Sequence, residues 1–121
     1  MPISYRIDPE TSIAVVTIQG VVSAQEQREH VERLFADPDL RPPFRILSDR
    51  REQENVPSTA LVQQMARLLA GVERAAGSRL AFVVARPVQI GMSRVFAAHV
   101  SNMEIEVFTD IDRARAWLLE G

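Results

Sequence analysis

Polar residues of types that bind ligands or carry modifications fall at the predicted junctions between strands and helices. Open α/β sheets bind ligands outside the carboxyl ends of their strands, where such junctions meet. We therefore predict a recognition edge at this place. Its residues are Asp49, Arg50, Ser58, Thr59, Arg86, Gly91 and Arg94. The simpler interpretation of the same residues is helix capping and loop solvation.

Two adjacent hydroxyls, those of Ser58 and Thr59, open a predicted helix. Free N–H groups and the helix dipole at such a position favour negative charge by about 0.3 to 1 kcal/mol, so a phosphate would be tolerated there. An unmodified hydroxyl also caps a helix. Both interpretations stay open at this point, a phosphorylation site and a plain cap.

The chain carries no recognisable catalytic centre. Its 5 glycines do not cluster into a phosphate-binding loop, and no serine lies in a G-x-S-x-G turn. The 2 histidines, His30 and His99, belong to different predicted helices and have no partner at ligand spacing. We expect His30 on a solvated helix face and His99 in a packed or interface position. We predict no enzyme activity, no metal and no cofactor; Asp49 and Arg86 are the least implausible catalytic pair.

Composition bounds the class of protein. A chain of 121 residues with 46% hydrophobic and 25% charged residues has the size and make-up of one globular domain. Its net charge of −2 and its lack of a basic run argue against a nucleic-acid partner. The longest apolar run, residues 80–85, is far below the roughly 20 residues that cross a bilayer. With no cysteine and no signal-peptide pattern, we expect a cytoplasmic protein.

Hydrophobic periodicity predicts the elements that position these residues. The predicted strands cover residues 5–8, 13–19, 44–49, 79–85 and 104–108. The predicted helices follow Ser23, Pro57, about Ile90, and Thr109, and they end near residues 37, 77, 102 and the C-terminus. The order is ββαβαβαβα, with an initial antiparallel hairpin and parallel crossovers after it. We predict a single α/β domain over residues 1–121, with a five-stranded, mixed, mostly parallel sheet and four helices.

Capping patterns set the expected helix starts. Ser23 and Glu26 have the spacing of a capping box, and Thr109 and Asp112 repeat it with a shorter acid.

An apolar set falls on one face of the helix predicted over residues 90–102. It comprises Met92, Val95, Phe96, His99, Val100 and Met103. Such a stripe is usually core packing, but it also suits an apolar ligand or an interface.

The element order, together with the segments SDR (48–50) and PSTAL (57–61), resembles STAS domains, the fold of bacterial anti-sigma-factor antagonists. Those domains run from an Asp-containing third strand to an Asp-Ser-Ser-Gly-Leu type motif at the next helix start. Ser58 and Thr59 match the hydroxyls, whereas Pro57 replaces the acid and Ala60 replaces the glycine. The resemblance implies a regulatory module that is switched by phosphorylation.

A closer likeness is to a STAS-like branch of small bacterial proteins. Its features look like the segments YRID (5–8), DPDLRP (37–42), IGMSRVF (90–96) and VFTD (107–110), the last leading to AWL (116–118). This branch is similar in fold to lipid-binding CRAL-TRIO domains. That similarity implies an apolar ligand or contact with a membrane surface.

Together these observations favour a non-enzymatic regulatory or protein-interaction module of STAS-like fold. It would act through surfaces near Ser58 and the helix over residues 90–102, on a protein partner or in a homodimer. The alternative is a binder of a small hydrophobic ligand, or a peripheral membrane protein, that uses the apolar face with the long second helix.

Overall fold

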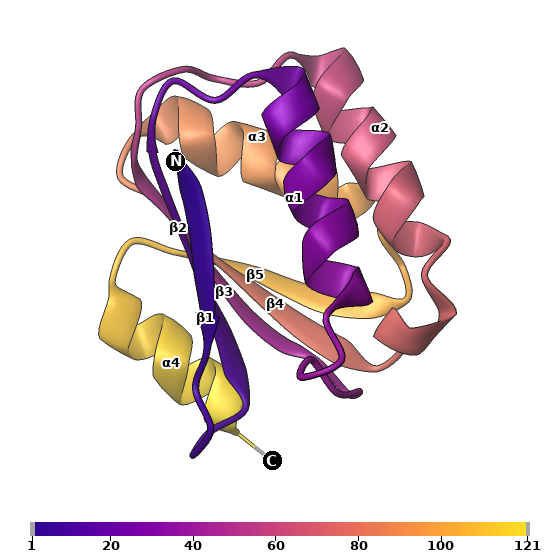
Figure 1. The fold of residues 1–121 in the computed structure, drawn as a ribbon. Helices are drawn as coiled ribbons and strands as arrows, with labels where there is room; N and C mark the ends of the chain where they lie inside the picture. The colour runs from indigo at the N-terminus through magenta and orange to yellow at the C-terminus, as the bar shows by residue number, and fades with distance from the viewer. Residues whose placement is uncertain (1, 121) are drawn as a thin grey trace.

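A five-stranded sheet forms the centre of the structure, a computed structural model that describes residues 2–120 (Figure 1). Its strands, in spatial order, are β1 (Ile3–Ile7), β2 (Ile13–Gly20), β3 (Arg45–Gln53), β4 (Ser78–Val83) and β5 (Met103–Phe108). β1 is antiparallel to β2, and every later neighbour is parallel. The predicted mixed, mostly parallel sheet is confirmed, with β4 inside it. Residues 1 and 121 of the predicted domain lie outside the described range.

The helices divide unequally between the two faces of the sheet. α1 (Ala24–Ala36), α2 (Thr59–Ala70) and α3 (Pro87–Ala98) lie on one face, and α4 (Ile111–Leu119) lies on the other (Figure 1). A short 3-10 helix, η1 (Glu73–Ala75), links α2 to β4. Within the described residues, no helix is long and apolar enough to cross a bilayer.

Side chains that alternate along the strands separate two apolar clusters. Val16, Ile46 and Phe82 belong to the cluster on the three-helix face. Leu47 and Ala81, each one residue away, belong to the cluster under α4. Because successive side chains of a strand point to opposite faces, neighbouring residues in β3 and β4 serve different layers.

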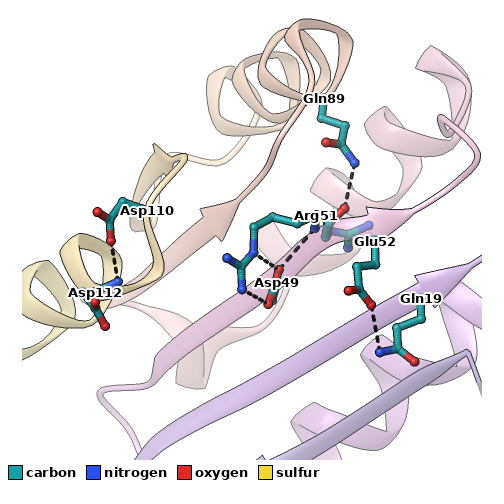
Figure 2. Close-up of polar contacts among 8 residues, drawn as sticks. Gln19, Asp49, Arg51, Glu52, Gln89, Asp110 and Asp112 are labelled. Atoms are coloured by element: carbon teal, nitrogen blue, oxygen red, sulfur yellow. Dashed lines mark hydrogen bonds and ion pairs between the residues drawn. The ribbon is translucent and has the colours of Figure 1, made fainter.

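Side-chain caps fix the starts of α1, α2 and α4. The Ser23 capping box is confirmed, since Ser23 Oγ accepts from Glu26 N and Glu26 Oε1 accepts from Ser23 N. The predicted cap at Thr109 is wrong by one residue. Asp110 Oδ1 accepts from the backbone N–H of Asp112 (Figure 2) and from that of Arg113. Its carboxylate therefore satisfies two free donors of the first turn of α4.

The predicted bounds of three elements are wrong by three residues or more. β3 continues to Gln53 instead of ending at Asp49, because β2 pairs with it as far as Gly20 through a register shift after Thr17. α2 ends at Ala70, where Gly71 is the C-cap, and the chain then forms η1 before Gly77, whose φ is +77°.

The third element is α3, which begins at Pro87 instead of about Ile90 and ends at Ala98 instead of near residue 102. Proline suits the first helical position because that N–H has no partner within the helix. The residues beyond Ala98 turn into β5, which starts at Met103.

Candidate functional site

A cavity of about 110 Å³ lies between the three-helix face and the sheet. Its walls come from α1, α2, α3 and the strands beneath, and most of them are apolar: Leu34, Leu61, Met65, Phe82 and Phe96 are examples. The lining extends into the loop after β3, where Val56 is 37% exposed. The cavity is therefore an apolar space that communicates with solvent.

Arg50 supplies a positive charge to this apolar space. Its Nε donates to Ser48 Oγ at 3.1 Å, and its Nη1 donates to Gln53 Oε1 at 3.1 Å and to Gln27 Oε1 at 3.4 Å. The guanidinium lies over the ring of Phe82, 5.5 Å from its centroid. Burial lowers the pKa of Arg50 to about 10. Every one of these partners is neutral.

His30 is the other ionisable group that lines the cavity from α1. The expectation of a solvated His30 is wrong, since this residue is only 7% exposed. Its ring lies 6.2 Å from that of Tyr5, centroid to centroid. Burial, together with the positive charges of Arg50 and Arg33, lowers the pKa of His30 to about 4. His30 is therefore neutral at pH 7.

Gln89 of α3 holds the backbone around Arg50. Its Nε2 donates to the Arg50 carbonyl oxygen at 2.7 Å (Figure 2), and its Oε1 accepts from the N–H groups of Ala85 and Arg86 at 2.9 and 3.0 Å. One buried amide thus fastens the end of β3 to the turn that enters α3. This contact fixes the position from which the Arg50 side chain reaches the cavity.

Comparison with known proteins places this fold in a family. The model of the SpoIIAA-like family matches residues 13–119. The chain belongs to the SpoIIAA-like family. Its fold is similar to the crystal structure of an uncharacterised DUF3478-family protein with a SpoIIAA-like fold from Shewanella loihica PV-4, with a TM-score of 0.68 and 18% identity over 96% of this chain and 91% of that one. Among curated proteins, none matches. The predicted STAS-like membership is confirmed.

In this SpoIIAA-like protein, the predicted recognition edge is divided between different surfaces. Asp49 points to the face opposite Arg50 and binds Arg51, with Oδ1 2.9 Å from Nε and Oδ2 2.8 Å from Nη2 (Figure 2). Arg86 Nη2 donates to the carbonyl oxygen of Gln53 at 2.8 Å. Asp49 and Arg86, considered as a catalytic pair, therefore have different partners.

The remaining residues of that edge are exposed. Ser58 Oγ accepts from Leu61 N at 3.1 Å, so Ser58 caps α2 as the simpler interpretation has it. Thr59 is exposed beside it, and Gly91 and Arg94 are exposed on α3. Phosphorylation at Ser58 or Thr59 stays a prediction.

The predicted apolar face is only partly a surface. Met92 and Phe96 line the cavity, and Val95 is half-buried on the same helix. His99 is exposed at the C-cap of α3. The other two members, Val100 and Met103, lie beyond α3 and are buried in the core at 5% and 7% exposure, because the chain has already turned towards β5.

Sequence reasoning missed the polar part of the cavity. Gln27, Gln53 and Gln89 are buried and contact Arg50, and none of them was among the predicted site residues. One signal was present in the sequence. Arg50 lies four residues after Ile46 in the strand, so both side chains point to the same face of the sheet. Within residues 2–120, no group of three or more His, Asp or Glu side chains could hold a metal ion.

Proposed function

We propose that this protein is a non-enzymatic module that binds a small apolar molecule in the cavity under α1, α2 and α3, as a carrier or sensor. The observation that carries the proposal is the cavity itself. Protein interiors are normally packed to the density of organic crystals, and voids larger than a water molecule are few. A mostly apolar cavity of about 110 Å³ is comparable with engineered apolar cavities of roughly 150 Å³ that bind benzene.

The cavity is lined by side chains of three helices, and this arrangement would allow a bound ligand to regulate the protein. Leu34, Leu61 and Phe96 reach the cavity from α1, α2 and α3 respectively. A ligand that contacts all three helices stabilises the arrangement in which they surround it, relative to any other arrangement. Occupancy would thereby be reported at the outer surfaces of the helices. A module of this kind would be regulated by ligand binding and would need no reaction of its own.

A neutral probe of matching size tests ligand binding. We expect cyclohexylmethanol to shift the backbone amide resonances of cavity residues such as Ser48, Phe82 and Ser93 in an NMR titration. Leu61→Trp should fill the cavity and weaken binding by about tenfold or more, because an indole removes the space and contacts that the probe needs.

Leu68→Trp is the matched control. Leu68 lies on the same helix, is 38% exposed and does not line the cavity, so this variant should bind like the wild type. Absence of a saturable shift in the wild-type protein, or equal weakening by both tryptophans, contradicts the proposal.

A second function, contact with a protein partner or a membrane surface, is supported by an exposed apolar rim. Val21, Val56 and Val88 are 66%, 37% and 47% exposed, and they follow β2, β3 and β4 at the carboxyl ends of these strands. The first two loops lie together, because Asn55 Oδ1 accepts from Val22 N and Asn55 Nδ2 donates to Val22 O (Figure 1).

Serine at all three valines should abolish binding at this rim. The readouts are sedimentation with anionic vesicles, affinity capture with mass spectrometry, and the oligomeric state by analytical ultracentrifugation. Leu119→Ser is the control, since Leu119 is 48% exposed but lies at the end of α4. If the triple variant and the control behave like the wild type in all three measurements, the rim has no such role.

Phosphorylation belongs to this second function. Ser58 and Thr59 are exposed beside Val56, so a phosphate there would alter the same surface. Ser58→Ala and Thr59→Ala should each be compared with the wild type for phosphate incorporation in cells. Unchanged phosphate incorporation and unchanged partner binding in both variants would contradict phosphorylation at Ser58 or Thr59.

A further inference from the structure

Arg50 places a positive charge in the wall of the cavity, and a purely apolar ligand would offer that charge no partner. Buried charges in proteins are normally paired with an opposite charge or held by a metal. Among the described residues, Arg50 forms no ion pair, and its Nη2 has no hydrogen-bond partner. The guanidinium therefore keeps donors and a positive charge available inside an apolar cavity.

The surroundings of Arg50 orient the guanidinium and leave its charge unneutralised. Ser48 and Gln53 accept from Nε and Nη1, and the face of Phe82 lies beneath the group. A planar guanidinium held in this way leaves the two N–H groups of Nη2 free, and one of them can donate to a carboxylate oxygen in a charge-assisted hydrogen bond. Pairing with an anion would also offset the desolvation that lowers the pKa of Arg50.

The size and charge of the cavity narrow the class of ligand. Its volume of about 110 Å³ suits an apolar body of about six carbon atoms, near the benzene that engineered cavities hold. His30, the other ionisable side chain lining the cavity, is neutral at pH 7 because its pKa is about 4. One cation in an apolar space matches one negative charge and would leave a second one unpaired.

We infer that the ligand is a small monocarboxylate with an apolar body, whose carboxylate pairs with Arg50 while the body packs against Leu61, Met65 and Phe96. This inference rests on the proposed function, because it requires the cavity to admit a ligand. It adds the chemical class that the cavity selects. Ser93, buried on α3 and also lining the cavity, stands beside the same space as a further hydroxyl donor.

Two probes of the same shape separate charge recognition from apolar binding. Cyclohexanecarboxylate and cyclohexylmethanol share the ring and differ in the anionic group, and both are titrated into the wild-type protein at pH 7 by NMR and calorimetry. We expect the carboxylate to bind about tenfold or more tightly than the alcohol, because hydrogen bonds to a charged group are about twice as strong as neutral ones.

Arg50→Met should remove this preference, so that the variant binds the two probes with affinities within about threefold of each other, since methionine keeps an apolar side chain of similar length and carries no charge. Binding of the alcohol by the variant also shows that it is folded. Arg67→Met is the matched control, because Arg67 is exposed on α2 and does not line the cavity. That variant should keep the full preference.

The outcomes distinguish the inference from the proposed function. If the wild type binds both probes equally, or if Arg50→Met keeps the preference, the inference is overturned while apolar binding stands. If the wild type binds neither probe, both are overturned. The comparison of the two probes on the wild type needs no variant, so it decides the matter even if Arg50→Met does not fold.

Discussion

Arg50 and Arg51 are neighbours in β3, yet they lie on opposite faces of the sheet and in opposite electrostatic settings. Arg51 is exposed and bound by both oxygens of Asp49, and this contact raises its pKa. Arg50 lies in the cavity among neutral partners, and burial lowers its pKa to about 10. The fold thus neutralises the charge of Arg51 with the carboxylate of Asp49, whereas no carboxylate neutralises the charge of Arg50.

The two faces of the sheet also differ in packing: the face of Arg51 is closely packed, and the face of Arg50 borders a cavity. Under α4, Leu47 and Leu118 are fully buried in a closed apolar cluster. Across the sheet, Leu61 and Met65 border an open cavity. A closed core contributes stability, whereas an open cavity with an unpaired charge costs stability and is typical of a binding site.

Truncation of a leucine on each face should give the largest contrast. Leu118→Ala should lower the free energy of unfolding by about 2 to 5 kcal/mol, because it creates a void in a packed cluster. Leu61→Ala should cost only about 1 kcal/mol, because this half-buried side chain already borders open space. Urea unfolding measures both values. Equal costs would show that the two faces are packed alike.

The cavity face should also govern the acid sensitivity of the fold. The unfolded chain protonates His30 near pH 6.5, but the folded protein does so only near pH 4, so protons favour unfolding between these values. The free energy of unfolding should therefore fall by about 3 kcal/mol as the pH drops from 7 to 4. Asp8, Asp37 and Asp49, whose pKa values are lowered from 3.8, lose their contributions only below this window.

Unfolding measured at several pH values separates this contribution. His30→Leu should flatten the dependence between pH 6.5 and 4. His99→Leu, at an exposed position, should keep the wild-type slope. A wild-type slope in His30→Leu would mean that His30 is protonated or solvated in the folded state.

The layout of the fold could be predicted from the sequence because each signal is local. Alternating strands, the Ser23 capping box and the apolar stripe of α2 act within a few residues, so the element order was correct. The sequence did not show that Asp49 and Arg50 of the predicted recognition edge lie on opposite faces, and the reason is non-local. β3 extends past Asp49 because β2 pairs with it there, and this pairing sends Asp49 and Arg50 to opposite faces.

The cavity could not be predicted from the sequence either, because it too depends on non-local packing. Its existence depends on how far α1, α2 and α3 stand from the sheet, which no single segment determines. Met92 and Phe96 were predicted from their helical spacing, but Val100 and Met103 were assigned to the same face because the end of α3 at Ala98 has no strong sequence signal. Spacing identifies which residues share a helix face, provided that the helix extends that far.

Neutralising each arginine of β3 should give the smallest effects and opposite signs. Arg50→Met removes a desolvated cation that no carboxylate neutralises, so the ligand-free protein should gain about 1 kcal/mol in free energy of unfolding, because this relief outweighs the hydrogen bonds that Ser48, Gln27 and Gln53 lose. Arg51→Met removes an exposed ion pair and should cost roughly 0.2 to 1 kcal/mol. Both values come from urea unfolding at pH 7. A loss of stability in Arg50→Met as large as that in Leu118→Ala would mean that Arg50 is a structural cation, satisfied by Ser48, Gln27 and Gln53, and that the asymmetry between the two faces serves the fold alone.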